Sequence, residues 1–223
     1  MLNRSTIDFL TELKQNNNRE WFAENKYKYE DAKSDLFKLI EKLIRELSKV
    51  DPNYSADTEP KKALMRIYRD VRFSKNKDPY KSNYGIAFDV KGYGPTTPSY
   101  YLHIQPGSCF FGVGFWQPET QVLKMVRQEI DYNSSTFLEV IEDKEFVKIF
   151  ELSQEDKLKK APKGYEIEHP QIEYLKLKSF IAIYKLRDEE FFQSSIVTKL
   201  TKAFNTIQPF VAFLRNATSH EEI

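Results

Sequence analysis

The sequence predicts an α+β fold: a single domain over residues 1–223, in which a mainly antiparallel β-sheet is flanked by N-terminal and C-terminal helices. Apolar residues recur at helical spacing near both ends of the chain, whereas the middle contains short runs of aromatic and β-branched residues. The turn between the last two runs is too short for the helical crossover that parallel strands need. With 40% hydrophobic residues in 223, the chain can bury one substantial core.

Two helices are expected in the N-terminal part of the chain. Ser5 and Asp8 have the spacing of a capping box, which predicts the start of a short first helix. Asn18 is the expected N-cap of a long second helix, whose apolar residues recur every three, four or seven positions. This helix is expected to end where Asp51 precedes Pro52, because proline disfavours a helical residue before it.

Four strands are expected in the rest of the chain. The runs at 84–90, 99–105 and 108–115 are short and rich in aromatic and β-branched residues, and a Pro-Gly turn at 105–108 joins the last two as a hairpin. Residues 178–186 have the same strand-like character. The short turn predicts antiparallel pairing.

The remaining predicted elements are helices. One helix is expected to open at Pro118, another at Asn133 or Ser134, and a short one at Pro170. Apolar residues at helical spacing over 200–214 predict a C-terminal helix.

Composition narrows the classes of protein to which the chain can belong. Its net charge is +1, and its single cysteine, Cys109, permits no internal disulfide. The N-terminus lacks the apolar segment of a signal peptide, and no apolar run approaches the roughly 20 residues of a membrane span. We therefore expect a soluble, cytoplasmic protein without a membrane partner. A near-neutral total charge also argues against a surface dedicated to nucleic acid.

The charges are unevenly distributed along the chain. Residues 61–81 contain eight lysines and arginines but only Asp70 and Asp78 as acids, so this stretch carries +6 and the remainder −5. Three tyrosines lie among or beside these cations. We call residues 66–84 the basic block, and the asymmetry predicts one basic patch on a mildly acidic body.

Several segments point to a known family. They are FLTELKQNNNREWFAENKYKYE, RIYRDVRFSKNKDPYKSNYG, YYLHIQPGSCFFGVGFWQPE, LKKAPKGY, HPQIEYLKLKSF and FNTIQPFVAFLRNA. With them the chain resembles, over nearly its whole length, the bacterial and fungal proteins grouped as domain of unknown function family 2461. The most specific segment is RDVRFSKNKDPYK, in which Asn76 departs from the family's Asp before the lysine, so that no carboxylate role carries over to this position. The resemblance implies boundaries and a candidate site, but no reaction.

The basic block predicts the binding, or the catalytic processing, of a phosphate-bearing or other anionic ligand. Guanidinium groups make bidentate contacts with phosphate, lysines act as point charges, and a tyrosine offers a hydroxyl or a stacking face. The three arginines are spaced by three, so a helical turn would gather them on one side whereas an extended chain would alternate them. The expected partner is a phosphorylated small molecule or a nucleic-acid backbone. The predicted anion-binding residues are Arg66, Arg69, Arg72, Lys77, Tyr80, Lys81 and His103, with Tyr68 and Tyr84 as further sources of a hydroxyl.

A structural interpretation of the block stands beside this one. Arg69, Asp70 and Arg72 are close enough in sequence to form an internal ion-pair network that fastens a loop to the sheet, and Pro79 favours a solvated turn. The chain would then be a structural or protein-interaction domain. Arginines without carboxylate partners would favour ligand binding, and arginines paired with internal carboxylates would favour the network.

Two further patterns are weaker indications of a functional site. Gly112 and Gly114 begin a GxG pattern that lacks a third glycine and a following helix, so they more simply make room for a neighbouring backbone or ring. His103 shares a strand face with Tyr101 and Gln105, and it is either a general acid or base or a hydrogen-bonded residue of the sheet.

No cofactor and no metal site are predicted. The three histidines are scattered and Cys109 has no partner at zinc spacing, while His169 before Pro170 is interpreted as a helix cap. Ser108 and Cys109 lack the strand-turn-helix context of a nucleophile elbow. The sequence contains no complete catalytic constellation.

Overall fold

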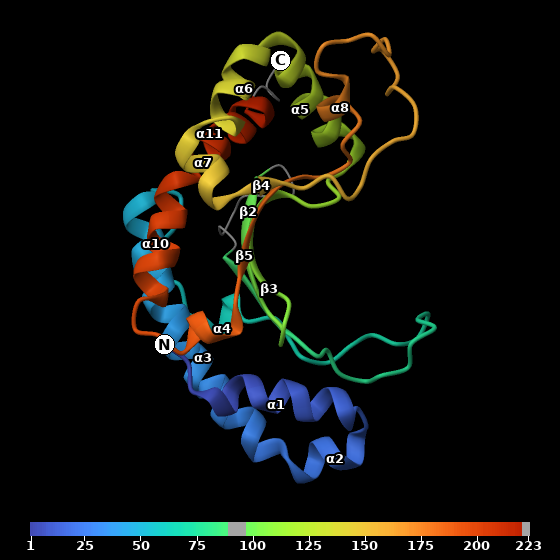
Figure 1. Cartoon of the computed structure of the whole chain (residues 1–223). Coiled ribbons are helices and arrows are strands. Elements are labelled where there is room, and N and C mark those ends of the chain that lie inside the picture. The colour runs from blue at the N-terminus through green and yellow to red at the C-terminus, as the bar shows by residue number, and fades with distance from the viewer. Residues whose placement is uncertain (89–96, 220–223) are drawn as a thin grey trace. The chain divides into compact units, whose positions relative to one another are not determined.

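The computed structural model describes residues 1–88 and 97–219 (Figure 1). Within these ranges eleven helices accompany a five-stranded antiparallel sheet, which confirms the predicted α+β fold. The strands lie in the order β1-β2-β3-β5-β4. Their bounds are Tyr84–Phe88 for β1, Ser99–Ile104 for β2, Cys109–Phe115 for β3, Glu151–Leu152 for β4 and Phe180–Leu186 for β5.

The four predicted strands are present with slightly shorter bounds. The first was expected to reach residue 90, and residues 89 and 90 lie outside the described residues. Strand β4 was not predicted, because two residues are too few to show an alternating pattern. It pairs antiparallel with β5, where Leu152 lies opposite Ala182.

The described residues form two compact units. Unit 1 contains Met1–Phe88, Tyr101–Phe111 and Lys185–Phe204. Unit 2 contains residues 97–100, Gly112–Tyr184 and 205–219. Strands β2, β3 and β5 each contribute residues to both units. The expectation of a single domain remains a prediction.

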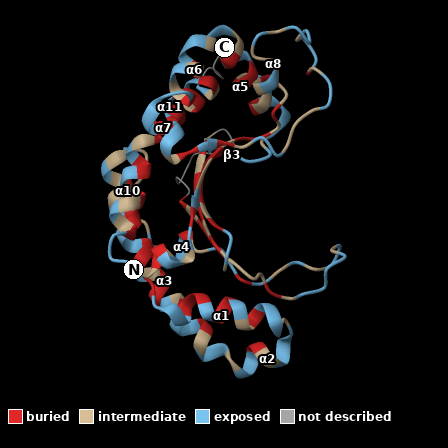
Figure 2. Cartoon of the chain, in the orientation of Figure 1, coloured by how far each residue is buried: buried red, intermediate tan, exposed pale blue. Residues whose placement is uncertain are grey.

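Unit 1 begins with three helices rather than two. They are α1 (Arg4–Gln15), α2 (Arg19–Glu24) and α3 (Lys26–Val50), so the predicted second helix is divided at Asn25. The predicted cap is confirmed, because Oδ1 of Asn18 accepts a hydrogen bond from the backbone N–H of Trp21 at 2.9 Å. Each of these helices turns its buried residues to one side and its exposed residues to the other (Figure 2).

The capping box predicted at Ser5 and Asp8 is wrong. Helix α1 starts two residues earlier, with Asn3 as its N-cap. The carboxylate of Asp35, on α3, accepts hydrogen bonds from the backbone N–H of Asn3 and from the hydroxyl of Thr6, both at 2.7 Å. A cap supplied by another helix leaves no local spacing signal in the sequence.

The remaining helices are mostly short. The predicted C-terminal helix is divided in two, because Pro209 stands in the first turn of the last helix and lacks the N–H that would continue the preceding one. The charged segment 142–165, for which no element was expected, contains one helix as well as β4. The bounds are Pro60–Ala63 for α4, Thr120–Tyr132 for α5, Ser134–Ile141 for α6, Lys144–Ile149 for α7, Ile172–Leu175 for α8, Asp188–Phe191 for α9, Ile196–Thr206 for α10 and Gln208–Thr218 for α11.

In unit 1 the sheet has one buried and one partly open face. The rings of Phe88 and Phe111 both lie against the ring of Phe204 on α10, with centroid separations of 6.4 and 5.3 Å. Leu102 and Ile104 of β2 face this core and have no exposed surface. The residues between and beyond them on β2 are only half-buried, so polar side chains occupy the other face.

One glycine of the GxG pattern has a packing role in unit 2. Gly114 has a φ of +133°, and a Cβ built on it would lie 2.0 Å from the carbonyl oxygen of Phe180 on β5. This confirms that the glycine makes room for a neighbouring backbone.

Candidate functional site

The structure places most of the basic block in an extended loop, residues 67–81, which we call the arm (Figure 1). Its two sides pair at the base. The backbone N–H of Lys81 donates to the carbonyl of Ile67 at 2.7 Å, and that of Arg69 donates to the carbonyl of Pro79 at 2.9 Å. None of the three arginines lies on a helical turn: Arg66 and Arg69 belong to the base of the arm, and Arg72 lies in a bend.

Tyr80 anchors the base of the arm. It lies opposite Tyr68 in an antiparallel bridge, and its ring stacks on Phe22 with a centroid separation of 4.0 Å and an interplanar angle of 12°. The side-chain amide of Asn17 donates to the carbonyl of Tyr80 and accepts from its N–H, both at 3.1 Å. Only 6% of Tyr80 is exposed. This predicted site residue holds the arm in place.

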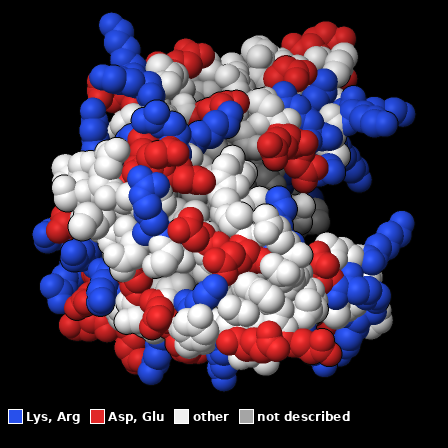
Figure 3. Space-filling model, turned by 60° about the horizontal axis from the view of Figure 1, so that its bottom comes forward, with Lys and Arg blue, Asp and Glu red and all other residues white. Residues whose placement is uncertain are grey.

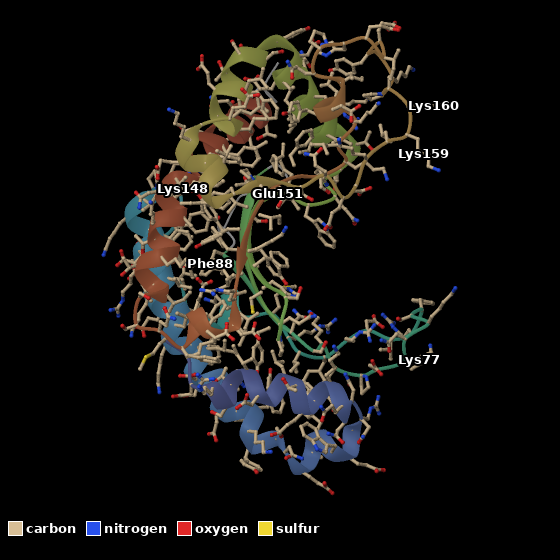
Figure 4. The ribbon with its side chains drawn as sticks, in the orientation of Figure 1. Lys77, Phe88, Lys148, Glu151, Lys159 and Lys160 are labelled. Carbon is tan, nitrogen blue, oxygen red and sulfur yellow. The ribbon has the colours of Figure 1, made fainter. Side chains whose placement is uncertain are left out.

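Two further predicted site residues cross-link the arm. The guanidinium of Arg69 donates to the carbonyl of Asp78 at 3.2 Å and to the hydroxyl of Ser74 at 3.4 Å. Nζ of Lys77 donates to the carbonyl of Val71 at 3.1 Å. Figure 4 shows Lys77 near the outer end of the arm. In the free protein these cations bond to the arm itself.

Arg72 forms an ion pair with Asp70. Its Nη2 lies 2.7 Å from Oδ2 of the carboxylate and its Nε lies 3.0 Å from Oδ1. Hydrogen bonds from the Arg72 side chain and backbone lower the pKa of Asp70, and the same contact raises the pKa of Arg72. Within the described part of the basic block this is the one ion pair shorter than 4.0 Å, and both side chains are exposed. Both partners belong to the arm, so this ion pair does not fasten the arm to the sheet.

Part of the excess charge is offset just before the block. Lys61 and Lys62 both pair with Glu59, at 2.7 and 2.6 Å. Their hydrogen bonds lower the pKa of Glu59 to about 2. The face shown in Figure 3 carries acidic and basic side chains interspersed with one another, in keeping with the near-neutral net charge.

Arg66 and Lys81 form what we call the basic pair. They lie on opposite sides of the arm's base, where the N–H of Lys81 bonds to the carbonyl of Ile67, the neighbour of Arg66. Among the described residues neither side chain has a hydrogen-bond or ion-pair partner, although Arg66 acts on Asp70 at longer range. Burial and the charge of Arg66 lower the pKa of Lys81.

The half-buried side chains of Tyr101, His103 and Gln105 form a second group, which we call the polar row. The hydroxyl of Tyr101 lies 3.1 Å from Nδ1 of His103, and Nε2 of His103 lies 3.3 Å from Oε1 of Gln105. The amide nitrogen of Asn83 lies 3.5 Å from the same Nδ1. The ring of Phe110 stacks on the imidazole with a centroid separation of 4.7 Å.

These contacts assign the proton on the imidazole. Because Oε1 of Gln105 can only accept, Nε2 of His103 carries the hydrogen and Nδ1 accepts from the hydroxyl of Tyr101. Burial lowers the pKa of His103 and raises the pKa of Tyr101. Both rings are therefore neutral near pH 7, and in the free protein His103 is a hydrogen-bonded residue of the sheet.

Gly85 allows the polar row to approach β1. A Cβ built on Gly85 would lie 2.8 Å from the hydroxyl oxygen of Tyr101 and 3.0 Å from Sδ of Met65. Sequence reasoning missed this role, although a lone glycine inside a strand pattern can signal such an approach. It also missed Asn83, for which the sequence offers no signal.

The basic pair lies close in sequence to residues that contact the polar row or lie beside it. Met65, whose sulfur and the Tyr101 hydroxyl both lie within 3.0 Å of a Cβ built on Gly85, directly precedes Arg66. Asn83 follows Lys81 by two residues.

Two other candidate residues are buried elsewhere in unit 1. Tyr84 is 2% exposed and its hydroxyl donates to the carbonyl of Thr6 at 3.2 Å, so it belongs to the core. Sγ of Cys109 lies 3.2 Å from the carbonyl of Gln105 and 3.3 Å from a carboxylate oxygen of Asp188. Burial raises the pKa of the Cys109 thiol to about 12, which removes it as a nucleophile near neutral pH.

His169, in unit 2, is not the helix cap that was predicted, because α8 starts at Ile172 with Gln171 as its N-cap. Its Nδ1 accepts from the backbone N–H of Gln171, just before α8, at 3.0 Å. Its Nε2 lies 2.9 Å from a carboxylate oxygen of Asp131. The third histidine, His220, lies outside the described residues.

Three other features of the described structure do not add to the candidate site. Over residues 1–88 and 97–219, no group of three histidine, cysteine, aspartate or glutamate side chains is placed to hold a metal ion. No helix in these ranges combines the length and apolar character needed to cross a bilayer. An open hollow of about 590 Å³ in unit 1 is lined by none of the predicted site residues; its walls are Lys42, Arg45, Glu46, Ser48, Lys49, Ala56 and Val197.

Comparison with known proteins gives one match. The family model described as "Conserved hypothetical protein (DUF2461)" matches residues 5–213, which is nearly the whole chain. No curated protein and no solved structure matches the chain.

Proposed function

Because the chain belongs to the DUF2461 family, whose description names no activity, we propose a function from the geometry of unit 1. The basic pair, Arg66 and Lys81, binds the phosphate group of a small phosphorylated ligand beside the polar row. One observation carries this proposal: these two cations lie on opposite sides of the arm's base, close enough for Arg66 to lower the pKa of Lys81, and have no carboxylate partner among the described residues, whereas Arg69, Arg72 and Lys77 are bonded within the arm.

The free energy of the empty site supports the proposal. Two like charges near each other repel, and burying part of Lys81 without a partner is unfavourable. Burial and then the charge of Arg66 lower the pKa of Lys81, and the lowered pKa reports that cost. A bound phosphate would relieve the repulsion and accept charge-assisted hydrogen bonds from both side chains. Perturbed pKa values cluster at binding and catalytic sites, and the lowered pKa of Lys81 fits such a site.

The polar row supplies the other half of a small-molecule site. Its neutral hydroxyl and amide groups, on Tyr101 and Gln105, can orient a ligand without adding charge, and so can the neighbouring amide of Asn83. The stacked rings of His103 and Phe110 present an apolar edge beside them. A phosphorylated sugar or nucleoside combines the anion and the hydroxyl groups that fit these donors and acceptors.

The test is a thermal-shift and calorimetric screen of inorganic phosphate, sugar phosphates and nucleotides at low salt. Stabilisation should grow with ligand concentration as RT ln(1 + [L]/Kd) and should weaken as salt is added. Arg66→Ala and Lys81→Ala should each weaken binding by about tenfold or more, because each removes a charged hydrogen-bond donor.

Lys62→Ala is the matched control. Lys62 belongs to the same +6 stretch, but its charge is paired with Glu59. It should bind phosphate ligands like the parent. Absence of a shift with every phosphorylated ligand at millimolar concentration and low salt, or equal loss of affinity in all three variants, would contradict the proposal.

A further inference from the structure

The outer part of the arm exposes an aromatic ring among cations. Phe73 is 96% exposed, more than any other large hydrophobic residue with a described position. The guanidinium of Arg72 lies 5.8 Å from the centroid of its ring. Lys75 and Lys77 follow within four residues, and both are exposed. We call Arg72, Phe73, Lys75 and Lys77 the arm tip.

Hydrogen bonds within the arm define the turn that leaves Phe73 exposed. The backbone N–H of Ser74 donates to the carbonyl of Val71 at 3.4 Å, and that of Asp78 donates to Oδ1 of Asn76 at 2.8 Å. Together with the cross-links from Arg69 and the anchored base, these bonds define the turn from which Phe73 points. Full exposure of a phenylalanine gains nothing for folding, because its ring buries no apolar surface.

We propose that the arm tip binds single-stranded nucleic acid, with a base stacked on Phe73 and phosphates held by Lys75 and Lys77. Proteins that bind single strands pair aromatic stacking platforms with cations that follow the backbone, and every base offers a π-face. Arg72 adds a cation at the edge of this platform, since its guanidinium already lies near the ring. The site is separate from the basic pair and does not depend on the function proposed for it.

The composition of the tip favours a single strand over other anionic partners. A membrane surface would need a broad apolar face, whereas Phe73 stands alone between charged and polar residues such as Ser74 and Asn76. In a duplex the base faces are already stacked, so a single exposed ring has no platform to meet. Lys75 has no partner within the described residues, and Lys77 bonds only a backbone carbonyl, so both charges are available to phosphate.

The test is fluorescence anisotropy with a labelled oligothymidine of about 12 nucleotides at low salt, a length that covers one small site. Phe73→Ala should weaken binding by about tenfold, whereas Phe73→Trp should bind at least as well as the parent, because stacking and not size alone supplies the affinity. Phe73→Leu should resemble Phe73→Ala. Lys75→Ala and Lys77→Ala should each reduce the slope of log K against log salt by about 0.7.

Two controls show whether oligonucleotide binding is specific to the arm tip. Tyr27→Ala removes another exposed aromatic ring that lies between two lysines, and it should leave oligonucleotide binding unchanged. Arg66→Ala should weaken binding of small phosphate ligands but not of the oligonucleotide, and Phe73→Ala should do the reverse. Because Phe73 is exposed, its variants should keep the parent's melting temperature.

The proposal is overturned if the parent does not bind the oligonucleotide at low salt, or if Phe73→Ala binds as tightly as the parent. Vesicles that contain phosphatidylserine provide the remaining comparison. Binding to them that requires Phe73, without binding to the oligonucleotide, would assign the tip to a membrane surface and would also overturn the proposal.

Discussion

The hydroxyl of Tyr101 donates to Nδ1 of His103 over 3.1 Å, and the other ring nitrogen of His103 donates to Gln105 over 3.3 Å. The first bond requires a neutral imidazole, because a protonated ring has no acceptor for the Tyr101 hydroxyl. The polar row is therefore arranged around an uncharged histidine.

This arrangement makes stability depend on pH. Burial lowers the pKa of His103 in the folded protein below its ordinary value, so the unfolded chain binds more protons between the two values. The free energy of unfolding should therefore be highest above about pH 6.5 and should fall as the pH drops below it, with a slope of at most about 1.4 kcal/mol per pH unit from this residue. Urea denaturation of the parent and of His103→Gln at several pH values between about 7.5 and 5 measures the difference. Identical slopes for the two proteins would contradict this assignment.

The contact above Gly85 predicts a coupling between two substitutions. Gly85→Ala should destabilise the fold by about 1 to 3 kcal/mol, because its Cβ would lie 2.8 Å from the hydroxyl oxygen of Tyr101. Tyr101→Phe removes that oxygen, so the double variant should lose less than the sum of the two single losses. Denaturant titrations of all four proteins give the coupling energy, and additive losses would show that Tyr101 does not limit the position.

Gly114 and Gly107 provide a matched pair with positive φ. Gly114→Ala should cost about 3 kcal/mol or more, because its Cβ would meet the carbonyl oxygen of Phe180 at 2.0 Å. Gly107 has a φ of +75° with open space around its Cβ position, so Gly107→Ala should cost only about 1 kcal/mol of backbone strain. Thermal unfolding distinguishes the two, and similar melting temperatures would contradict the packing role of Gly114.

Arg127 is a buried cation with a structural role in unit 2. It is 8% exposed, and its guanidinium donates to the carbonyls of Leu175 and Leu177 at 2.7 and 3.0 Å. Arg127→Met should destabilise the fold by about 2 to 3 kcal/mol, because it leaves both carbonyls without these donors. Lys124→Met, an exposed change on the same helix α5, should be nearly neutral in the same denaturation assay.

Arg72→Ala should leave the denaturation midpoint unchanged, because the pair that Arg72 forms with Asp70 is exposed to solvent. Asp70→Asn should behave in the same way. A large loss of stability in either variant would indicate that the arm depends on this pair, contrary to its exposure.

The sequence predicts the elements of unit 1 better than the site that they form. Periodicity identifies β2 and places Tyr101, His103 and Gln105 on one face, because alternation is a local property of the strand. Sequence reasoning missed the division of the second helix at Asn25, where the side-chain amide donates to the carbonyl of Trp21, and the absence of a capping box at Ser5, which has a tertiary cause. In the latter case Asp35 lies 29 positions or more from the groups that it caps.

The role of each cation in the basic block could not be read from spacing. Arg66, Arg69 and Arg72 repeat every three residues, yet the backbone pairing at the base of the arm gives each a different environment. Arg69 cross-links the arm, Arg72 pairs with Asp70, and Arg66 lies in the basic pair. These assignments depend on which residues face each other across the arm, and no pattern in the sequence specifies that register.

The side-chain amide of Asn17 protects a backbone edge of the arm from pairing with a second molecule. Tyr80 and Tyr68 form a pair whose flanking bonds, from Lys81 to Ile67 and from Arg69 to Pro79, leave the N–H and carbonyl of Tyr80 directed away from Tyr68. Asn17 occupies both groups with the bonds that a strand from a second chain would otherwise make. A side chain thus closes an edge at which copies of the protein could add to one another, and Asn17→Ala should increase aggregation on storage.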